Sequence, residues 1–228
     1  MRRLLKPVFV LFLSMAAALA QAGALDAIST GDASAGVKEA LSKGADYAVA
    51  SLGKNGGFLG NDKVKIPLPG YLQKAESALR MFGMGKQADQ LVETMNHAAE
   101  NAVAVAKPVL VESIKKMSVQ DAKGILTGGE DSVTQYFKRT STEQLTAKFL
   151  PIVKKETGKL QLADQYNKFA GKAASAGLIE QKDADIDSYV TQKAMDGLFL
   201  MIAEEEKKLR ANPVGAGSDL LKKVFGAL

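Results

Sequence analysis

The chain has 228 residues, no cysteine and a formal net charge of +5 at pH 7, with 46% hydrophobic and 24% charged residues. Without cysteine it forms no disulfide, so an ordinary hydrophobic core must stabilise it, and one domain of this length can build such a core. Residues 1–22 hold three of its 30 basic residues and none of its 25 acidic ones, so residues 23–228 carry only +2. This small excess, spread over short lysine pairs, argues against a nucleic-acid-binding protein.

The N-terminus predicts a leader. Two arginines and a lysine precede an apolar run over residues 8–19, and Ala20-Gln21-Ala22 follows it. This layout is typical of a secretory signal peptide that is cleaved after residue 22, and it predicts a periplasmic protein of a bacterium. The apolar run is shorter than the roughly 20 residues of a spanning helix, which favours cleavage over a retained anchor. The paired arginines leave the twin-arginine export route open beside the general secretory route.

Apolar residues recur at helical spacing through most of residues 23–228, which predicts a single all-α domain, a multi-helix bundle. Glycines at positions 53, 83, 158 and 177 and Asn212-Pro213 are expected to end helices, and Pro108 either breaks its pattern or begins a helix. The apolar stripes lie over residues 37–52, 72–82, 91–103, 109–117, 133–137, 145–153, 160–173, 186–209 and 221–225.

Helix start signals are dense between residues 118 and 158. Ser118 with Asp121 predicts an N-cap, and Ser132 predicts the cap of a second helix. Ser141 followed by Gln144 matches a capping box that would open a third helix. Pro151 lies inside this third pattern and predicts a kink or a break there.

The segment 53–70 does not fit a helix. It is rich in glycine at first and then alternates Val64, Ile66 and Leu68 with polar residues and two prolines. We expect a long loop whose extended part turns these three side chains to one side and docks on the helices, with the glycines as hinges. Two interpretations remain open, a connector that covers the core and a gate over a ligand pocket. Phe58, Ile66 and Leu68 are the candidate apolar binding residues of this loop.

Several motifs carry a resemblance to a known family. They are Gly56-Gly57-Phe58-Leu59, Val64-Lys65-Ile66-Pro67-Leu68-Pro69, Asp121-Ala122-Lys123-Gly124-Ile125-Leu126, Thr134-Gln135-Tyr136-Phe137, Lys148-Phe149-Leu150-Pro151-Ile152-Val153 and the stretch 189–199. The chain resembles the bacterial proteins grouped as domain of unknown function 4197, over essentially all of residues 23–228. The resemblance implies a small exported α-helical protein. It brings no assigned activity, so no catalytic residue is carried over.

The best candidate for a polar site lies between two expected short helices. If these helices pack as a hairpin, Asp121, Lys123, Asp131, Tyr136 and Arg139 could converge as a binding or hydrolase-like site. The alternative is a structural network of caps and ion pairs, which is common on helix surfaces and is the favoured interpretation.

No metal or cofactor site is predicted. His97 is the sole histidine, so a metal centre would lack ligands, and a structural or surface role is expected for it. Asp183, Asp185 and Asp187 alternate as in a calcium loop, but the glycine and glutamate of such a loop are missing. We expect them to cap and stabilise a helix N-terminus instead.

The methionines are expected in the core, because they fall on or near the apolar stripes. Gly197, inside the longest stripe, would permit a close approach or a groove. The sequence therefore leaves three hypotheses: a non-enzymatic module that binds an apolar ligand or an envelope partner, a hydrolase-like enzyme built on the polar cluster, and a structural envelope-stress protein. The first is favoured, with no nucleic-acid partner and no transmembrane segment after signal cleavage.

Overall fold

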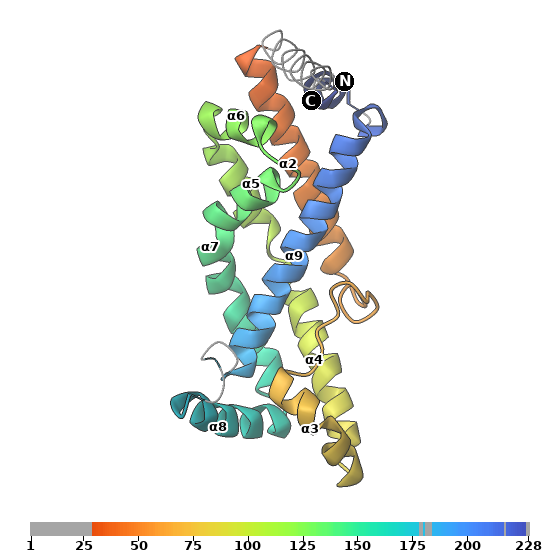
Figure 1. Ribbon diagram of the computed structural model, residues 1–228, viewed down its shortest axis with the longest axis vertical. Helices are drawn as coiled ribbons and strands as arrows, with labels where there is room; N and C mark the ends of the chain where they lie inside the picture. Colours follow the sequence, from red (N-terminus) through yellow and green to blue (C-terminus); the bar gives the residue numbers. More distant parts are fainter. Residues whose placement is uncertain (1–28, 178–179, 181–183, 217, 227–228) are drawn as a thin grey trace, which may run out of the picture.

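The computed structural model describes residues 29–177, 180, 184–216 and 218–226, and the expected leader lies outside them. The described residues form helices and no strand, which confirms the all-α prediction (Figure 1). The helices are α2 (Thr30–Leu52), α3 (Gly70–Met81), α4 (Gly85–Val103), α5 (Lys107–Lys116), α6 (Val119–Thr127), α7 (Ser132–Thr157), α8 (Gln161–Ser175), α9 (Ile186–Ala211), the 3-10 turn η2 (Pro213–Ala216) and α10 (Asp219–Phe225).

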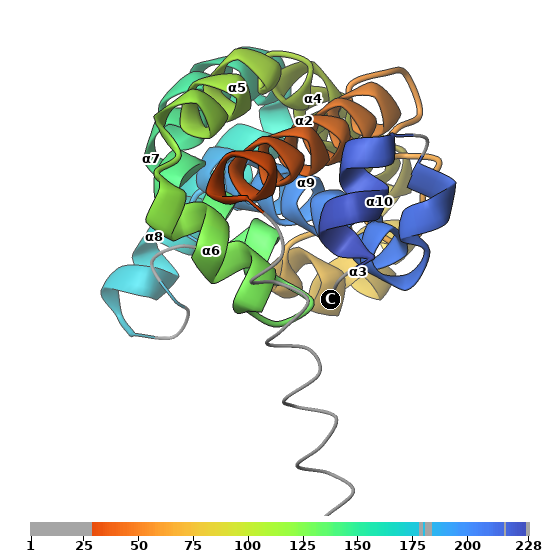
Figure 2. The same cartoon turned by 90° about the horizontal axis from the view of Figure 1, so that it is seen from above.

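The bundle is built around α9, which runs along the long axis of an elongated molecule (Figure 1). Helices α2, α4 and α7 pack against it, and α5 and α6 pack on α2 and α7. Figure 2 shows α10 folded back beside α2 at one end of the molecule. The α3–α4 hairpin and α8 form the other end (Figure 1). None of the described helices is long and apolar enough to cross a membrane.

Several local predictions are confirmed at helix ends. Ser118 caps α6, and its side chain and that of Asp121 form a reciprocal capping box. Pro108 lies in the first turn of α5 and so begins a helix rather than breaking one. Gly53 ends α2 and Ser218 caps α10. These helix ends could be predicted from the sequence because each depends on a few neighbouring residues.

Helix α7 runs without interruption from Ser132 to Thr157, which corrects three expectations. Ser132 is its first helical residue, after Asp131, and Ser141 opens no new helix. Ser141 is instead buried in the middle of α7, where its hydroxyl donates to the carbonyl of Phe137 at 2.5 Å. The helix also continues past Pro151, which is exposed, so no break occurs there. A serine that satisfies its hydroxyl within its own helix can occupy a crowded apolar stripe at little cost.

The loop between α2 and α3 is docked on the bundle, as the alternation predicts. Val64, Ile66 and Leu68 are all buried, whereas Lys65 and Pro67 between them are exposed. The loop is positioned by α4. The side-chain amide of Asn96 accepts from the Ile66 N–H at 2.8 Å and donates to the Ile66 carbonyl at 2.9 Å. Because a single fully buried side chain satisfies both backbone groups, it replaces a neighbouring strand.

Two of the loop glycines have a local structural reason, because Gly56 has a positive φ of 76° and Gly57 is closely packed; the expected hinge role stays a prediction. Gly57 is buried, and a Cβ atom there would lie 2.3 Å from the carbonyl oxygen of Leu52. A similar contact explains Gly197 in α9, where a Cβ would lie 2.6 Å from the ring of Phe58. Of the two interpretations of Gly197, the close approach is therefore the one observed.

Four of the six methionines in residues 23–228 lie in the core, as expected. The α3–α4 turn differs from the predicted apolar stripe. Met95 and Met195 are buried, as are Met117 and Met201, and Met84 is partly buried. Met81 and Phe82 are instead 86% and 82% exposed. The predicted stripe includes Phe82, but α3 ends at Met81, so Phe82 lies in the turn and is exposed.

Candidate functional site

The predicted polar cluster is brought together only in part. Asp121 Oδ1 lies 2.8 Å from Arg139, and the Arg139 guanidinium also lies over the ring of Tyr136. The Tyr136 hydroxyl donates to the backbone carbonyl of Ser113 at 2.6 Å and is buried. Burial raises the pKa of Tyr136, and the nearby Asp121 adds to the effect. The hydroxyl is committed to the backbone, so it does not face a substrate.

The other two residues of the cluster stay apart from this trio in the contacts described. Lys123 is exposed on α6, and the Asp131 carboxylate accepts from Gln135 on the surface of α7. The Asp121 carboxylate is held by its capping box first, and this hydrogen bonding lowers its pKa. The arrangement fits the structural network of caps and ion pairs that the sequence favoured.

A buried carboxylate anchors the loop instead. Glu100 of α4 accepts from the backbone N–H groups of Phe58 and Leu59 at 2.9 and 3.1 Å. His97 Nδ1 lies 2.7 Å from its second oxygen, which gives the sole histidine a structural partner. Burial raises the pKa of Glu100, but the hydrogen bonds from His97 and the two N–H groups outweigh it and hold the pKa below its ordinary value.

We predict that Glu100→Gln loosens the loop. The free energy of unfolding at neutral pH should fall by about 1.5–3 kcal/mol, the contribution of hydrogen bonds to a charged group. Because the folded-state pKa of Glu100 is lowered, its contribution is complete above the ordinary value of 4.5 and is lost as the pH falls through the folded pKa. Denaturant unfolding at several pH values should therefore show a constant deficit at neutral pH that shrinks in acid. A deficit that grows in acid would contradict this role.

A second buried carboxylate binds the N-terminus of helix α7. Glu206 of α9 is 3% exposed and accepts from the N–H groups of Val133 and Thr134 at 3.0 and 3.2 Å. These are N–H groups that the first turn of a helix cannot satisfy itself. Burial raises the pKa of Glu206, against the opposing effect of Val133 and of Arg210.

Arg210 joins the same contact, where the end of α6 and the start of α7 meet α9; we call this the α6–α7 corner. Its guanidinium lies 3.0 Å from Glu206 and also donates to the carbonyl of Ile125 and to the hydroxyl of Ser132. One side chain of α9 thus joins the end of α6 to the start of α7. The two residues lie four positions apart on α9, and the pair is largely shielded from solvent, with side-chain exposures of 14% for Arg210 and 2% for Glu206.

The predicted capping role is confirmed for Asp185. Asp185 accepts from the N–H of Ser188 at 2.9 Å and caps α9. Asp187 is buried and accepts from the hydroxyl of Thr157, and burial raises its pKa. Asp183 lies outside the described residues. Within the described ranges, no group of three or more His, Cys, Asp or Glu side chains is arranged to hold a metal ion.

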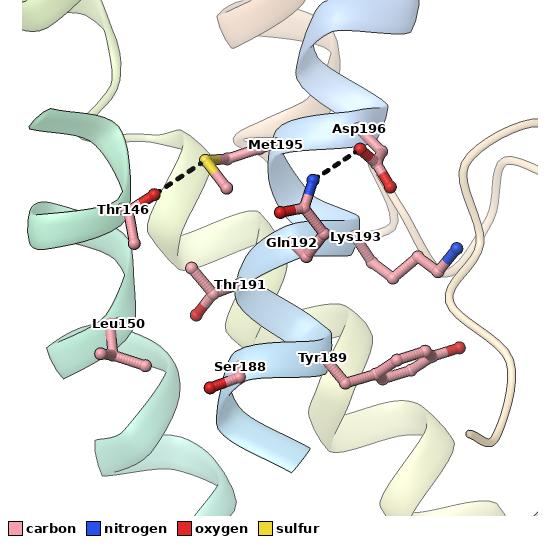
Figure 3. Close-up of a pocket in the computed structure, with 9 residues that line it drawn as sticks. All are labelled: Thr146, Leu150, Ser188, Tyr189, Thr191, Gln192, Lys193, Met195 and Asp196. Carbon is pink, nitrogen blue, oxygen red and sulfur yellow. Dashed lines mark hydrogen bonds between the residues drawn. The ribbon is translucent and has the colours of Figure 1, made fainter. Parts of the chain in front are cut away.

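The best candidate for a binding site is a groove of about 500 Å³ between α7 and α9. Figure 3 shows α7 on one side and the exposed face of α9 on the other. Leu150 and Met195 provide apolar surface, whereas the ring of Tyr189 projects away from α7 and its hydroxyl donates to the carbonyl of Pro67 at 3.1 Å (Figure 3). The mouth is polar. The residues that line the groove are Thr146, Leu150, Ser188, Tyr189, Thr191, Gln192, Lys193, Met195 and Asp196.

Thr191 distinguishes this groove from an ordinary surface hollow. It is 2% exposed, and its hydroxyl is the one buried side-chain oxygen without a hydrogen-bond partner in the described part of the chain. In Figure 3 the oxygen faces the space between α7 and α9. Many other hydroxyls in these helices donate to the carbonyl four residues earlier: those of Ser42, Thr127, Thr140, Ser141, Thr142, Thr146, Thr157 and Ser175. A buried polar atom left unpaired is uncommon and calls for a partner.

The rest of the groove is already hydrogen-bonded internally. The Thr146 hydroxyl lies 3.3 Å from the sulfur of Met195, and Gln192 donates to Asp196 at 2.9 Å (Figure 3). The Lys193 ammonium lies over the ring of Tyr189. The walls are therefore preformed, and the Thr191 hydroxyl is the buried group among the described residues that lacks a partner.

The apolar candidates from the loop lie elsewhere. Phe58 and Ile66 are fully buried in the core, and Leu68, 5% exposed, lines a hollow of about 450 Å³ between the loop, α3 and α4. Three charged groups of that hollow pair with each other, since Arg80 binds both Glu76 and Asp89. This hollow offers no comparable unpaired group, so it is the weaker candidate.

Sequence reasoning missed the groove except for its methionine. Ser188, Gln192 and Asp196 recur four residues apart, which is the pattern of any solvated helix face. The buried threonine beside them also has an ordinary helical position. What distinguishes it is the orientation of its hydroxyl, which depends on how α7 packs on α9.

The comparisons with known proteins agree with the resemblance found in the sequence. A family model described as a protein of unknown function (DUF4197) matches residues 27–226. No curated protein and no solved structure matches the chain.

Proposed function

Because the chain belongs to the DUF4197 family of proteins of unknown function, which brings no activity with it, we propose from the site alone that it is an exported, non-enzymatic module that binds a small amphipathic molecule between α7 and α9. The observation that carries the proposal is the unpaired, buried hydroxyl of Thr191 in the wall of this groove. The leader-like residues 1–22 support export to the periplasm.

The groove suits such a ligand by size and lining. Its volume of about 500 Å³ lies within the range of small-molecule sites. The ligand's apolar body would contact Leu150 and Met195, and one of its hydrogen-bonding groups would pair with Thr191. Lys193 and Asp196 both line the groove, so its rim carries one positive and one negative group and suits a polar head of the ligand. A wholly apolar ligand would leave the Thr191 hydroxyl unpaired and is disfavoured for that reason.

A binding role also fits the electrostatics better than an enzymatic one. The buried carboxylates of Glu100 and Glu206 accept hydrogen bonds from backbone N–H groups and hold the loop and α7 in place. Asp187 is paired with Thr157. The shifted pKa values therefore belong to structural contacts, and none of these three groups lines the groove.

We predict that Thr191→Val makes the free protein more stable and a weaker binder. The change keeps the shape of the side chain and removes the unpaired hydroxyl, so the free energy of unfolding should rise by about 1–3 kcal/mol. Calorimetric titration with decanoate, a simple amphipathic probe, should show an affinity about tenfold lower than that of the unsubstituted protein, the equivalent of one lost hydrogen bond.

Thr157→Val is the matched control, because the Thr157 hydroxyl is equally buried but paired with Asp187 and the Val153 carbonyl. It should lower stability and leave decanoate binding unchanged. Equal decanoate affinity in the Thr191→Val variant and the unsubstituted protein, or no binding by either, would contradict the proposed site.

A further inference from the structure

The most exposed large apolar side chains of the described residues lie next to each other in the α3–α4 turn. Met81 is 86% and Phe82 is 82% exposed, and of the other large hydrophobic residues only Val214, at 72%, comes near them. The turn lies at the end of the molecule opposite α10 (Figure 1). Two neighbouring apolar side chains at a protruding end indicate a contact surface rather than the scattered exposure that is normal for a soluble protein.

The turn is held in this conformation by its own contacts. The N–H of Phe82 donates to the carbonyl of Ala78, and Gly83 follows with a positive φ of 76°, which a glycine adopts without strain. Arg80 then ties α3 to α4, since its guanidinium lies 2.9 Å from Glu76 and 2.7 Å from Asp89. Met81 and Phe82 therefore project from a braced turn.

The shape of the turn argues against a second copy of the chain as the partner. Two side chains of this size expose roughly 300–400 Å² together. A stable dimer needs about 800 Å² from each partner, with complementary shape. A convex tip of this area would hold two copies together only weakly. A fluid lipid surface, by contrast, accepts an apolar side chain without a preformed pocket.

Charge near the turn favours an anionic lipid surface. Lys86 begins α4 beside the turn, and Lys74 lies on α3 seven residues before Met81 and thus on the same side of the helix. Neither lysine forms a salt bridge with the described residues, whereas the charge of Arg80 is matched by two acids. We infer that the α3–α4 turn docks on an anionic lipid surface by inserting Phe82 and Met81 between the head groups, with Lys74 and Lys86 as the cationic contacts.

This contact is independent of the α7–α9 groove, and it has a direct optical test. The chain has no tryptophan, so Phe82→Trp introduces a single reporter at an exposed position that does not threaten folding. Tryptophan emission of the full chain without its leader should shift to shorter wavelength on addition of vesicles of phosphatidylethanolamine and phosphatidylglycerol. The shift should be smaller with vesicles of phosphatidylcholine alone. An equal shift with both would overturn the anionic part of the inference.

Val214→Trp is the control, because Val214 is a similarly exposed apolar residue in η2, at the other end of the molecule. Its emission should not respond to vesicles. In a sedimentation experiment, the double variant Met81→Ser, Phe82→Ser should bind the anionic vesicles about tenfold or more weakly. Unchanged Phe82→Trp emission with anionic vesicles would overturn the inference and leave a protein partner as the occupant. A shift that depends on protein concentration without lipid would overturn it in favour of self-association.

Discussion

Replacing Arg210 by Met should lower the free energy of unfolding by about 3–5 kcal/mol, because it leaves the buried carboxylate of Glu206 without its counter-charge. Arg210 also supplies the donors that the Ile125 carbonyl and the Ser132 hydroxyl use, so the α6–α7 corner loses its link to α9. Denaturant unfolding of residues 23–228 measures the loss directly.

The pH dependence of this variant has a defined sign. Burial already raises the pKa of Glu206 above its ordinary value of 4.5, and loss of Arg210 removes an opposing effect. A carboxyl group with a raised folded-state pKa favours folding most in acid, and this contribution is lost as the pH rises through that pKa. The deficit of Arg210→Met should therefore be largest at neutral pH and shrink towards pH 4.5.

Arg139→Met is the matched control, because Arg139 also pairs with an acid, Asp121, but is 65% exposed. Its loss should cost about 1 kcal/mol or less. A second check is Glu206→Gln combined with Arg210→Met, which removes the unpaired charge and should recover part of the stability. Similar losses in the two arginine variants would contradict the view that Arg210 and Glu206 form the buried joint of the bundle.

Replacing Phe58 by Ala should cost about 3–5 kcal/mol, because the ring is fully buried where the loop contacts α9. The loop would lose its largest apolar contact while its backbone keeps the hydrogen bonds with Asn96 and Glu100. We therefore expect increased hydrogen exchange over residues 53–69, measured together with the loss of stability. Loss of stability without local exchange in the loop would show that the ring supports the core alone.

Gly197→Ala tests the same contact from the other side. The added Cβ would lie 2.6 Å from the ring of Phe58, so the change should destabilise the unsubstituted protein even though alanine is the better helix former. In the Phe58→Ala background the clash is gone, and the same change should be neutral or stabilising. Gly124→Ala in α6 meets no atom within 4 Å and should stabilise by roughly 0.5–1 kcal/mol. Additive effects of the Phe58 and Gly197 changes would contradict the contact.

Much of the fold could be predicted from local signals. The cap at Ser118, the start of α5 at Pro108 and the end of α2 at Gly53 each depend on a few neighbouring residues. The alternation of Val64, Ile66 and Leu68 also predicts which side of the loop is buried. In these cases the local preference and the tertiary environment agree.

The sequence-based predictions were wrong where one sequence pattern is compatible with two structures and tertiary packing decides between them. Ser141 with Gln144 matches a capping box, yet Ser141 is a buried member of a continuous helix. Phe82 continues an apolar stripe, but α3 ends before it. The local sequence contains no signal for either outcome, because each depends on the position of a neighbouring helix.

The buried polar contacts and the groove were also beyond sequence reasoning. Asn96 and Glu100 bind backbone groups 30 to 42 residues away, and Glu206 binds N–H groups 72 and 73 residues away. On one helix each looks like an ordinary polar position. The hydroxyl of Thr191 became informative only because the structure shows that it is buried and unpaired. The candidate site could therefore be located only after the packing of α7 on α9 was known.

Native mass spectrometry of the chain purified from the cells that express it tests ligand binding between α7 and α9 most directly. If a ligand binds between α7 and α9, we expect a small-molecule adduct of defined mass on the unsubstituted protein. The adduct should be lost in Gln192→Trp, which fills the mouth of the groove, and retained in Gln165→Trp, a substitution at an exposed position on α8. Recovery of the bare polypeptide mass alone, or an adduct present equally in all three proteins, would contradict the account.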